Sequence, residues 1–346
     1  MEKPPSLNGM RILVAADKFR GTATAAEVAA AVQLGAARAG DHQVTSVAMS
    51  DGGEGLLEVF GGANRTTTVS GPLGDPVEAG WYFDGRRAVI ESARASGLAI
   101  VGGAEGNDAM AASTYGTGEL IVAALDSGAR EIIVGVGGSA TTDGGLGALR
   151  AIYPARLRGV DLIAACDVRI PFGAAARLFA AQKGATANEV EMLGRRLERL
   201  VDVYRAEHHV DVSELEGSGA GGGLAGGLAA VGAALVSGFE VVVEATDLDE
   251  RMGDADLVVT GEGFVDAESF DGKVVGGVIE LARECERPVL VIAGEVFDRH
   301  MFEGSDACVD VISLVERFGR EAAMTDTTEC IAQAVATWLG ASTITA

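Results

Sequence analysis

Residues 257–277 decide how this chain is interpreted, and they read Leu-Val-Val-Thr-Gly-Glu-Gly-Phe-Val-Asp-Ala-Glu-Ser-Phe-Asp-Gly-Lys-Val-Val-Gly-Gly. The apolar run Leu257–Val259 predicts the end of a buried strand. Gly261 and Gly263 allow a sharp turn and a close approach of the backbone to a ligand. A helix is expected to begin near Val274. Polar loops between a strand and a helix are where α/β enzymes place their chemistry, so the stretch predicts a functional site.

The same order of strand, polar loop and helix recurs near the N-terminus. Residues 12–16 are apolar and run into the loop 17–22, and Thr24 with Glu27 forms a capping box for the helix that follows. A second apolar segment, 44–49, ends at the glycine loop 50–55. This repetition favours a parallel α/β sheet.

The middle of the chain has a different pattern. Asp84-Gly85 lies between two alternating segments and predicts a β-hairpin, which marks a domain change near residue 71. Residues 217–239 carry no charge and are rich in glycine and alanine. Because most of them are not strongly apolar, we expect a closely packed internal helix over 224–239 rather than a membrane span.

After residue 240 the parallel pattern returns, with strands expected at 257–260, 288–293 and 309–314 and helices at 274–285 and 320–339. We therefore predict an α/β protein in which a doubly wound parallel sheet domain holds a second α/β domain inserted in the middle of the chain. Residues 1–70 and 240–346 would form the Rossmann- or flavodoxin-like domain and 71–239 the insert, with the active site in the cleft between them.

Composition limits the partners of the protein. The 346 residues carry a net charge of -23, which argues against binding of nucleic acid or anionic membranes, because both attract Lys and Arg. Only four lysines occur, Lys3, Lys18, Lys183 and Lys273. The four cysteines form no CxxC pair, and no apolar leader begins the chain, so we expect a cytoplasmic protein. A homodimer is a further expectation.

Four loops at the ends of predicted strands carry carboxylates. They contain Asp51 with Glu54, Asp143, Asp167, and Glu262 with Asp266. Backbone amides at such loops bind phosphate without side-chain cations, and neighbouring carboxylates suit Mg²⁺, which prefers oxygen ligands. The alternative is that these are ordinary turn and capping residues.

Two standard nucleotide motifs do not fit. Gly272-Lys273 lacks the first glycine and the final Ser or Thr of a P-loop. Residues 135–140 formally match GxGxxA, but no acidic residue follows a second strand at the expected distance, so binding of a dinucleotide is only weakly indicated.

Taken together, the loops resemble the bacterial glycerate kinases that are neither P-loop nor actin-like, in order and over nearly the whole chain. The segments that carry the resemblance are 17–21, 50–55, 71–74, 90–98, 116–120, 135–145, 165–168, 182–185, 219–223 and 260–273. The resemblance implies transfer of a phosphoryl group from ATP, with Mg²⁺, to a hydroxyl of D-glycerate or a similar small hydroxy acid.

On this basis the site residues are assigned by role. The catalytic candidates are Lys18, Arg20, Asp143 and Lys273; the nucleotide and phosphate candidates are Gly137, Gly138, Ser139, Thr141, Gly144, Gly219, Gly221, Gly222, Thr260, Gly261 and Gly263; the substrate candidates are Arg20, Asp266 and Ser269; and the metal candidates are Asp51, Glu54, Asp167 and Glu262.

The chain also departs from the family pattern. Phe264 stands where the family usually has Arg, Glu268 where it has Gln, and Ile170 where it has Asn, and two segments are shorter. Phe264 removes a cation that holds a carboxylate or phosphate, and Glu268 adds a negative charge. The alternative is therefore a relative with a changed substrate or without catalysis, acting in binding or regulation.

Overall fold

The computed structural model describes residues 9–19, 21–166, 168–270, 273–302 and 309–342. It divides into a terminal unit, Met1–Met49 with Val242–Ala346, and a central unit, Ser50–Val241. The expected boundary near residue 71 lies too late in the chain. The reason is that strand β3 (Arg65–Ser70) pairs antiparallel with β4 (Pro76–Phe83), which places residues 50–70 in the central unit.

The terminal unit is a parallel, doubly wound sheet. Its strands are β1 (Arg11–Val14), β2 (Gln43–Ser46), β9 (Leu257–Val265), β10 (Val289–Val296) and β11 (Val309–Ser313). They lie in the order β11-β10-β9-β1-β2, and every pair is parallel. Counted within the unit this is the flavodoxin-like order, so the predicted fold class is confirmed.

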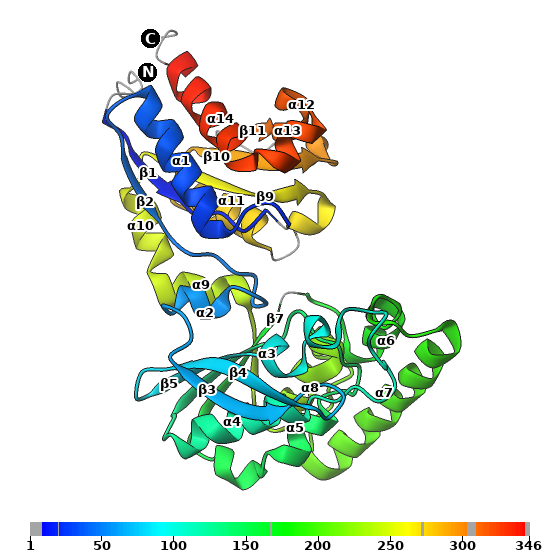
Figure 1. Cartoon of the computed structure of the whole chain (residues 1–346). Coiled ribbons are helices and arrows are strands. Elements are labelled where there is room, and N and C mark those ends of the chain that lie inside the picture. Colours follow the sequence, from blue (N-terminus) through cyan, green and yellow to red (C-terminus); the bar gives the residue numbers. More distant parts are fainter. Residues whose placement is uncertain (1–8, 20, 167, 271–272, 303–308, 343–346) are drawn as a thin grey trace. The chain divides into compact units, whose positions relative to one another are not determined.

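Helices pack against this sheet. They are α1 (Ala25–Ala39), α10 (Leu248–Asp254), α11 (Val274–Glu284), α12 (Leu314–Phe318), α13 (Arg320–Thr325) and α14 (Thr327–Ser342), with short 3-10 turns η6 (Ala267–Phe270) and η7 (Arg299–Phe302). Figure 1 shows α1 beside α14, and both share a core with Ile12 and Val14. The capping box of Thr24 and Glu27 at the start of α1 is confirmed. Leu13 alternates to the other face and is buried there, as a sheet covered on both faces requires.

Strand β9 is longer than expected. The apolar run was predicted to end at a glycine turn, but β9 pairs with β10 as far as Val265 opposite Val296. Gly261 is needed because a Cβ there would lie 2.0 Å from the Ile292 carbonyl oxygen. The glycine therefore serves close strand packing rather than a turn.

The central unit holds a mixed six-stranded sheet. In addition to β3 and β4 it contains β5 (Arg87–Glu91), β6 (Glu131–Gly135), β7 (Asp161–Cys166) and β8 (Ala234–Ser237), in the order β3-β4-β5-β6-β7-β8. β3 to β5 are antiparallel, which confirms the hairpin at Asp84-Gly85, and β5 to β8 are parallel.

The helices of the central unit are mostly short. They are α2 (Leu56–Val59), α3 (Ala93–Ser96), α4 (Tyr115–Asp126), α5 (Leu146–Ala151), α6 (Ala175–Phe179), α7 (Ala187–His208) and α8 (Leu224–Ala230), with 3-10 turns η1 (Leu98–Val101), η2 (Pro154–Leu157), η3 (Phe172–Ala174), η4 (Ala181–Lys183) and η5 (Ala220–Gly223), while α9 (Gly238–Thr246) crosses the division between the units. The helix expected over 224–239 is wrong beyond Ala230: Gly232 adopts a left-handed conformation (φ 103°) that ends α8, and β8 follows. Within the described residues, no helix has the length and apolarity to cross a bilayer.

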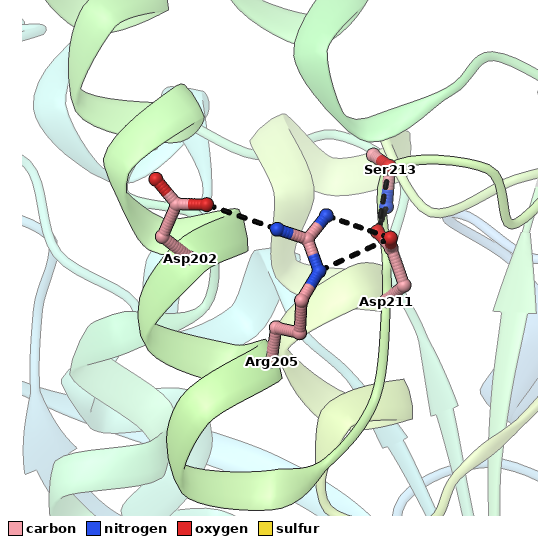
Figure 2. Close-up of polar contacts among 4 residues, drawn as sticks. All are labelled: Asp202, Arg205, Asp211 and Ser213. Carbon is pink, nitrogen blue, oxygen red and sulfur yellow. Dashed lines mark hydrogen bonds and ion pairs between the residues drawn. The ribbon is translucent and has the colours of Figure 1, made fainter.

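An ion-pair cluster fixes the chain after α7 (Figure 2). Arg205 donates to Asp202 (Nη1 to Oδ1, 3.0 Å) and to Asp211 (Nη2 to Oδ2, 2.7 Å). The Ser213 hydroxyl donates to Asp211, and together with Arg205 it lowers the pKa of that carboxyl to about 2. The segment that leads into the glycine-rich stretch 217–223 is thereby held to the end of α7.

The contact of α1 with α14 gives a stability prediction. A Cβ at Gly35 would lie 2.5 Å from the Ala332 carbonyl oxygen and 2.8 Å from the Val335 Cβ. We expect Gly35→Ala to destabilise the protein by about 2 to 3 kcal/mol, because the helices must move apart, and to lower the melting temperature in scanning calorimetry. Gly253→Ala, in α10 with open space around its Cβ, is the control and should be neutral or slightly stabilising. Equal effects of the two changes would contradict the packing argument.

Candidate functional site

The terminal unit has its topological switch point between β1 and β9. β1 pairs with β2 on one side and with β9 on the other, so the strand order reverses direction at this place in the sheet. Ligands of doubly wound sheets bind beyond the carboxyl ends of the strands at such a point. Asp17 lies there, with its amide bonded to the Gly261 carbonyl (2.9 Å). The Lys18 amide donates to the Asp17 carboxylate (2.7 Å), and the Lys18 side chain is half-buried.

Glu262 is the most perturbed carboxyl at this point. Burial disfavours its charge and raises its pKa to about 7, while a hydrogen bond from Ser269 and the charge of Lys273 partly oppose the rise. The carboxylates of Asp17 and Asp266 add repulsion. Among the described residues, its buried Oε1 has no hydrogen-bond partner. The structure thus gathers predicted catalytic, substrate and metal candidates around one buried carboxyl.

Asp266 and Ser269, both predicted to bind substrate, hold each other. The Asp266 amide donates to the Ser269 hydroxyl and the Ser269 amide to the Asp266 carboxylate, each at 3.2 Å. This reciprocal pair shapes the turn η6 in front of α11. Lys273 is the N-cap of α11.

Three of the predicted nucleotide residues serve the sheet. The buried Thr260 hydroxyl donates to the Ala15 carbonyl (2.7 Å) and joins β9 to β1. Gly261 lies against the Ile292 carbonyl, and the Gly263 carbonyl lies where a Cβ of Gly294 would stand, 2.2 Å away. These contacts place Thr260 and Gly261 inside the sheet and leave no open surface at either for a nucleotide.

Phe264 lies on the same face of β9 as Glu262, by the alternation of a strand. It is 47% exposed and meets Phe297, which is 61% exposed, edge to face with ring centroids 6.3 Å apart. An aromatic pair therefore stands two residues from the buried carboxyl. Arg20, Asp167 and Gly272 lie outside the described residues.

In the central unit, Asp143 organises the loop between β6 and α5. Its two carboxylate oxygens accept from the Thr114 amide (2.9 Å) and hydroxyl and from the amides of Gly145 and Gly147 (both 3.1 Å). A carboxylate with so many donors is a structural acceptor at the start of a helix. These contacts show Asp143 shaping the loop, and its predicted catalytic role is not needed to explain them.

The two glycine stretches 137–145 and 219–223, both predicted to cradle phosphate, are packed together. The Gly144 amide donates to the Gly222 carbonyl (3.1 Å), and a Cβ at Gly222 would lie 1.9 Å from the Thr141 carbonyl oxygen. Gly221 and Gly222 both adopt left-handed conformations, which glycine allows without strain.

In the stretch 137–145, several carbonyl groups accept hydrogen bonds from the protein, whereas several amide groups donate none. The carbonyls of Gly138, Ala140 and Thr141 accept from protein donors at 3.0, 3.0 and 2.7 Å. The amides of Gly137, Gly138, Thr141 and Thr142, in contrast, donate to no acceptor in the part of the chain that is described. A loop with satisfied carbonyls and unused amides is suited to an anion.

The predicted loop 50–55 lies beside the loop 137–145. A Cβ at Gly53 would be 3.5 Å from the Gly137 Cα, and one at Gly52 would be 3.0 Å from the Ala165 carbonyl oxygen at the end of β7. The buried Glu91, which sequence reasoning did not assign, accepts from the amides of Gly55 and Leu57 (both 3.0 Å) and so fixes the end of this loop. Three of the predicted loops therefore meet at the carboxyl ends of β6 and β7.

The metal candidates have the donor chemistry that Mg²⁺ prefers. Asp51 is half-buried and Glu54 exposed on the loop beside Gly137. Over the described ranges, no group of three or more His, Cys, Asp or Glu is arranged to hold a metal ion. Mg²⁺ commonly uses one or two carboxylates together with substrate phosphates and water, and Asp51 and Glu54 fit that pattern.

Sequence reasoning noticed Lys183 but gave it no role. Its side chain is 5% exposed and donates to the Ser139 hydroxyl (2.9 Å) and to the Thr141 carbonyl (2.7 Å). The scarcity of lysine in this chain was the available signal, because a rare residue type beside a glycine in a candidate loop invites a specific explanation.

Several known proteins are similar to this chain over most of its length. The family model described as the glycerate kinase family matches residues 12–154 and 152–341. The glycerate 2-kinase of Escherichia coli K12 is 39% identical, with 84% of this chain and 86% of that protein covered. The glycerate kinase of Bacillus subtilis 168 is 38% identical, with 83% and 85% covered. A crystal structure described as glycerate kinase 2 from Salmonella typhimurium LT2 has a TM-score of 0.77 and 32% identity over 98% of this chain and 99% of that one.

The fold and these matches define a phosphotransferase with two α/β units. The chain belongs to the glycerate kinase family. The resemblance inferred from the loops is therefore confirmed, and ATP follows as the phosphate donor of a kinase of this family.

The pKa of Glu262 gives a pH-dependent prediction. Its folded-state pKa of about 7 exceeds the ordinary value of 4.5, so the native protein binds this proton more tightly than the unfolded chain does. Stability therefore falls as pH rises from 4.5 to about 7. Glu262→Gln keeps the shape without the charge, and we expect it to melt like the unaltered protein at pH 5 but higher at pH 8, by about 2 kcal/mol in stability.

The control for this measurement is Glu284→Gln, an exposed position on α11, which should follow the unaltered protein at both pH values. A lower melting temperature for Glu262→Gln at pH 8 would show that neighbouring groups favour the charged carboxylate, contrary to the burial argument.

Proposed function

We propose that the protein transfers the γ-phosphoryl group of ATP to a hydroxyl of D-glycerate. The observation that carries the proposal is the loop 137–142, in which the carbonyls of Gly138, Ala140 and Thr141 accept from the protein while the amides of Gly137, Gly138, Thr141 and Thr142 donate to no acceptor among the described residues. Membership in the glycerate kinase family supports the same substrate. The Escherichia coli relative is a glycerate 2-kinase, so the 2-hydroxyl is the acceptor to test first.

In this proposal each cluster has a separate task. Those amides of 137–145 and 219–223 that donate to no acceptor among the described residues would cradle the phosphates. Asp51 and Glu54, with Asp167 and Glu262 as further candidates, would provide oxygen ligands for Mg²⁺. When bound, Mg²⁺ neutralises charge on the phosphates. Catalysis of phosphoryl transfer depends mostly on positioning and charge neutralisation, for which preorganised amides are well suited.

The terminal unit would supply the cations. Lys18 and Lys273 would stabilise the transferring phosphoryl group, and Arg20 would hold the glycerate carboxylate. Asp266 and Ser269 form the turn that leads to Lys273, so we propose that they position this lysine and the substrate beside it. That both units contribute to one active site remains a prediction, as does a homodimer.

The alternative function is supported by Phe264. Its exposure beside Glu262, together with Phe297, provides an aromatic surface where a hydroxy acid's charged groups need a cation. A relative with a less polar substrate, or one that only binds nucleotide, would keep the fold and the loop 137–142 and lack turnover of glycerate.

The proposal is tested by mixing the purified protein with ATP, MgCl₂ and D-glycerate. We expect ADP to form in step with a phosphoglycerate, and ³¹P NMR distinguishes the 2-phospho from the 3-phospho product. Turnover should disappear when EDTA exceeds Mg²⁺ and return when Mg²⁺ is added back. Background turnover, in an assay where the Escherichia coli relative works, rejects glycerate as the substrate, and calorimetry with ATP then separates a changed substrate from a protein without nucleotide binding.

The role of Lys273 gives a second test. If its ammonium stabilises charge on the transferring phosphoryl group, we expect Lys273→Ala to lower kcat about 100-fold or more with little change in melting temperature. Arg283→Ala, which removes an exposed cation from the same helix, should leave kcat within about twofold. A similar loss of kcat in both variants would mean that only the net charge matters.

A further inference from the structure

The loop 137–142 is anchored by backbone contacts on one side. The Leu98 amide donates to the Gly138 carbonyl (3.0 Å), and the Ala140 amide donates to the Ser96 carbonyl (2.9 Å). These two bonds form an isolated antiparallel bridge between Gly97 and Ser139. One edge of the loop is therefore fixed to the segment that follows β5.

Side chains anchor the other edge. The Lys183 ammonium donates to the Ser139 hydroxyl (2.9 Å) and to the Thr141 carbonyl (2.7 Å). The Asn107 amide group donates to the Ala140 carbonyl (3.0 Å) and also to the Lys183 carbonyl (2.7 Å). Lys183 thus contacts Ser139 and Thr141. Asn107 contacts Ala140 between them and also holds the backbone of Lys183.

The backbone that carries Lys183 is fixed in turn. Gly184 has a left-handed conformation (φ 94°), and a Cβ there would lie 2.4 Å from the Ala104 carbonyl oxygen. Only glycine allows the turn η4 to pack so closely against residues 104–107. This close packing fixes the backbone from which the Lys183 side chain reaches the loop 137–142.

Unused polar groups lie beside the oxygens that Lys183 holds. The buried hydroxyls of Thr141 and Thr142 have no hydrogen-bond partner among the described residues, although buried polar groups normally do. The loop therefore has unused donors next to the two oxygens to which the Lys183 ammonium donates.

We infer that Lys183 is a positioning residue for the polyphosphate chain of a nucleoside triphosphate. It holds Ser139 and Thr141 so that the unused amides of the loop present a fixed surface to phosphate oxygens. The inference rests on the proposed kinase function and adds to it the residue that shapes the phosphate site.

The test compares Lys183→Met and Lys183→Arg with Arg196→Met. Arg196 is a suitable control because its guanidinium donates to the Met110 carbonyl (3.0 Å) elsewhere in the central unit. We expect Lys183→Met to raise the Kd for ATP and for inorganic tripolyphosphate, measured by calorimetry, about 10- to 100-fold. The KM for glycerate should stay within about threefold, Lys183→Arg should recover part of the affinity, and Arg196→Met should match the unaltered protein.

Circular dichroism and melting temperatures show whether each variant folds. If Lys183→Met does not fold, Ser139→Ala leaves the ammonium in place and removes one of its anchors, and we expect a rise in the ATP Kd of about 3- to 10-fold. An ATP Kd unchanged within twofold in either folded variant overturns the inference, as does failure of the unaltered protein to bind ATP and tripolyphosphate.

The outcomes also separate this inference from the proposed function. If the unaltered protein phosphorylates glycerate while Lys183→Met keeps its affinity for ATP, the function stands and the inference fails. If tripolyphosphate binding depends on Lys183 but glycerate is not phosphorylated, the inference stands and the glycerate proposal fails.

Discussion

The close packing of two glycine segments, 136–145 and 217–227, is the constraint on which the central unit depends. A Cβ at Gly222 would lie 1.9 Å from the Thr141 carbonyl oxygen, and one at Gly227 would lie 2.6 Å from the Gly144 carbonyl oxygen. Backbone meets backbone at both places, so neither segment can shift without the other. Asp143 completes the arrangement by accepting from three residues around it. The result is a preformed surface of amides, and preformed dipoles need no reorganisation when a charged group binds.

A protein with a net charge of -23 repels ATP at long range, so it must bind phosphate with local groups. In the proposed function, the central unit does so with backbone amides that are held in place by the buried Lys183. The terminal unit instead brings Lys273 near Glu262, whose protonation is governed by burial. The two units therefore offer different chemistry: the central unit provides a fixed loop of backbone amides, and the terminal unit provides a group of charges whose balance depends on pH.

The sequence predicted the fold well where periodicity is strong. Five parallel strands of the terminal unit and the hairpin at Asp84-Gly85 follow from apolar runs and turn residues. The prediction failed at Gly261, because glycine serves both in turns and where two strands pack closely. Gly261 was interpreted as a turn residue but lies inside β9, and only the neighbouring strand β10 reveals its contact with the Ile292 carbonyl. The loops 137–145 and 219–223 were both assigned to phosphate binding, but the packing of 50–55 beside 137–145 was not predicted, since residues 50–55 were placed in the other domain. The anchoring role of Lys183 likewise depends on distances that no sequence pattern encodes.

The most direct test of the account is a crystal structure of the full chain with MgCl₂ and a non-hydrolysable ATP analogue. The account predicts that phosphate oxygens lie about 3 Å from the amide nitrogens of Gly137, Gly138, Thr141 and Thr142, with the Lys183 ammonium still bonded to Ser139 and the Thr141 carbonyl. Phosphates bound elsewhere, with those amides facing only water, would contradict it.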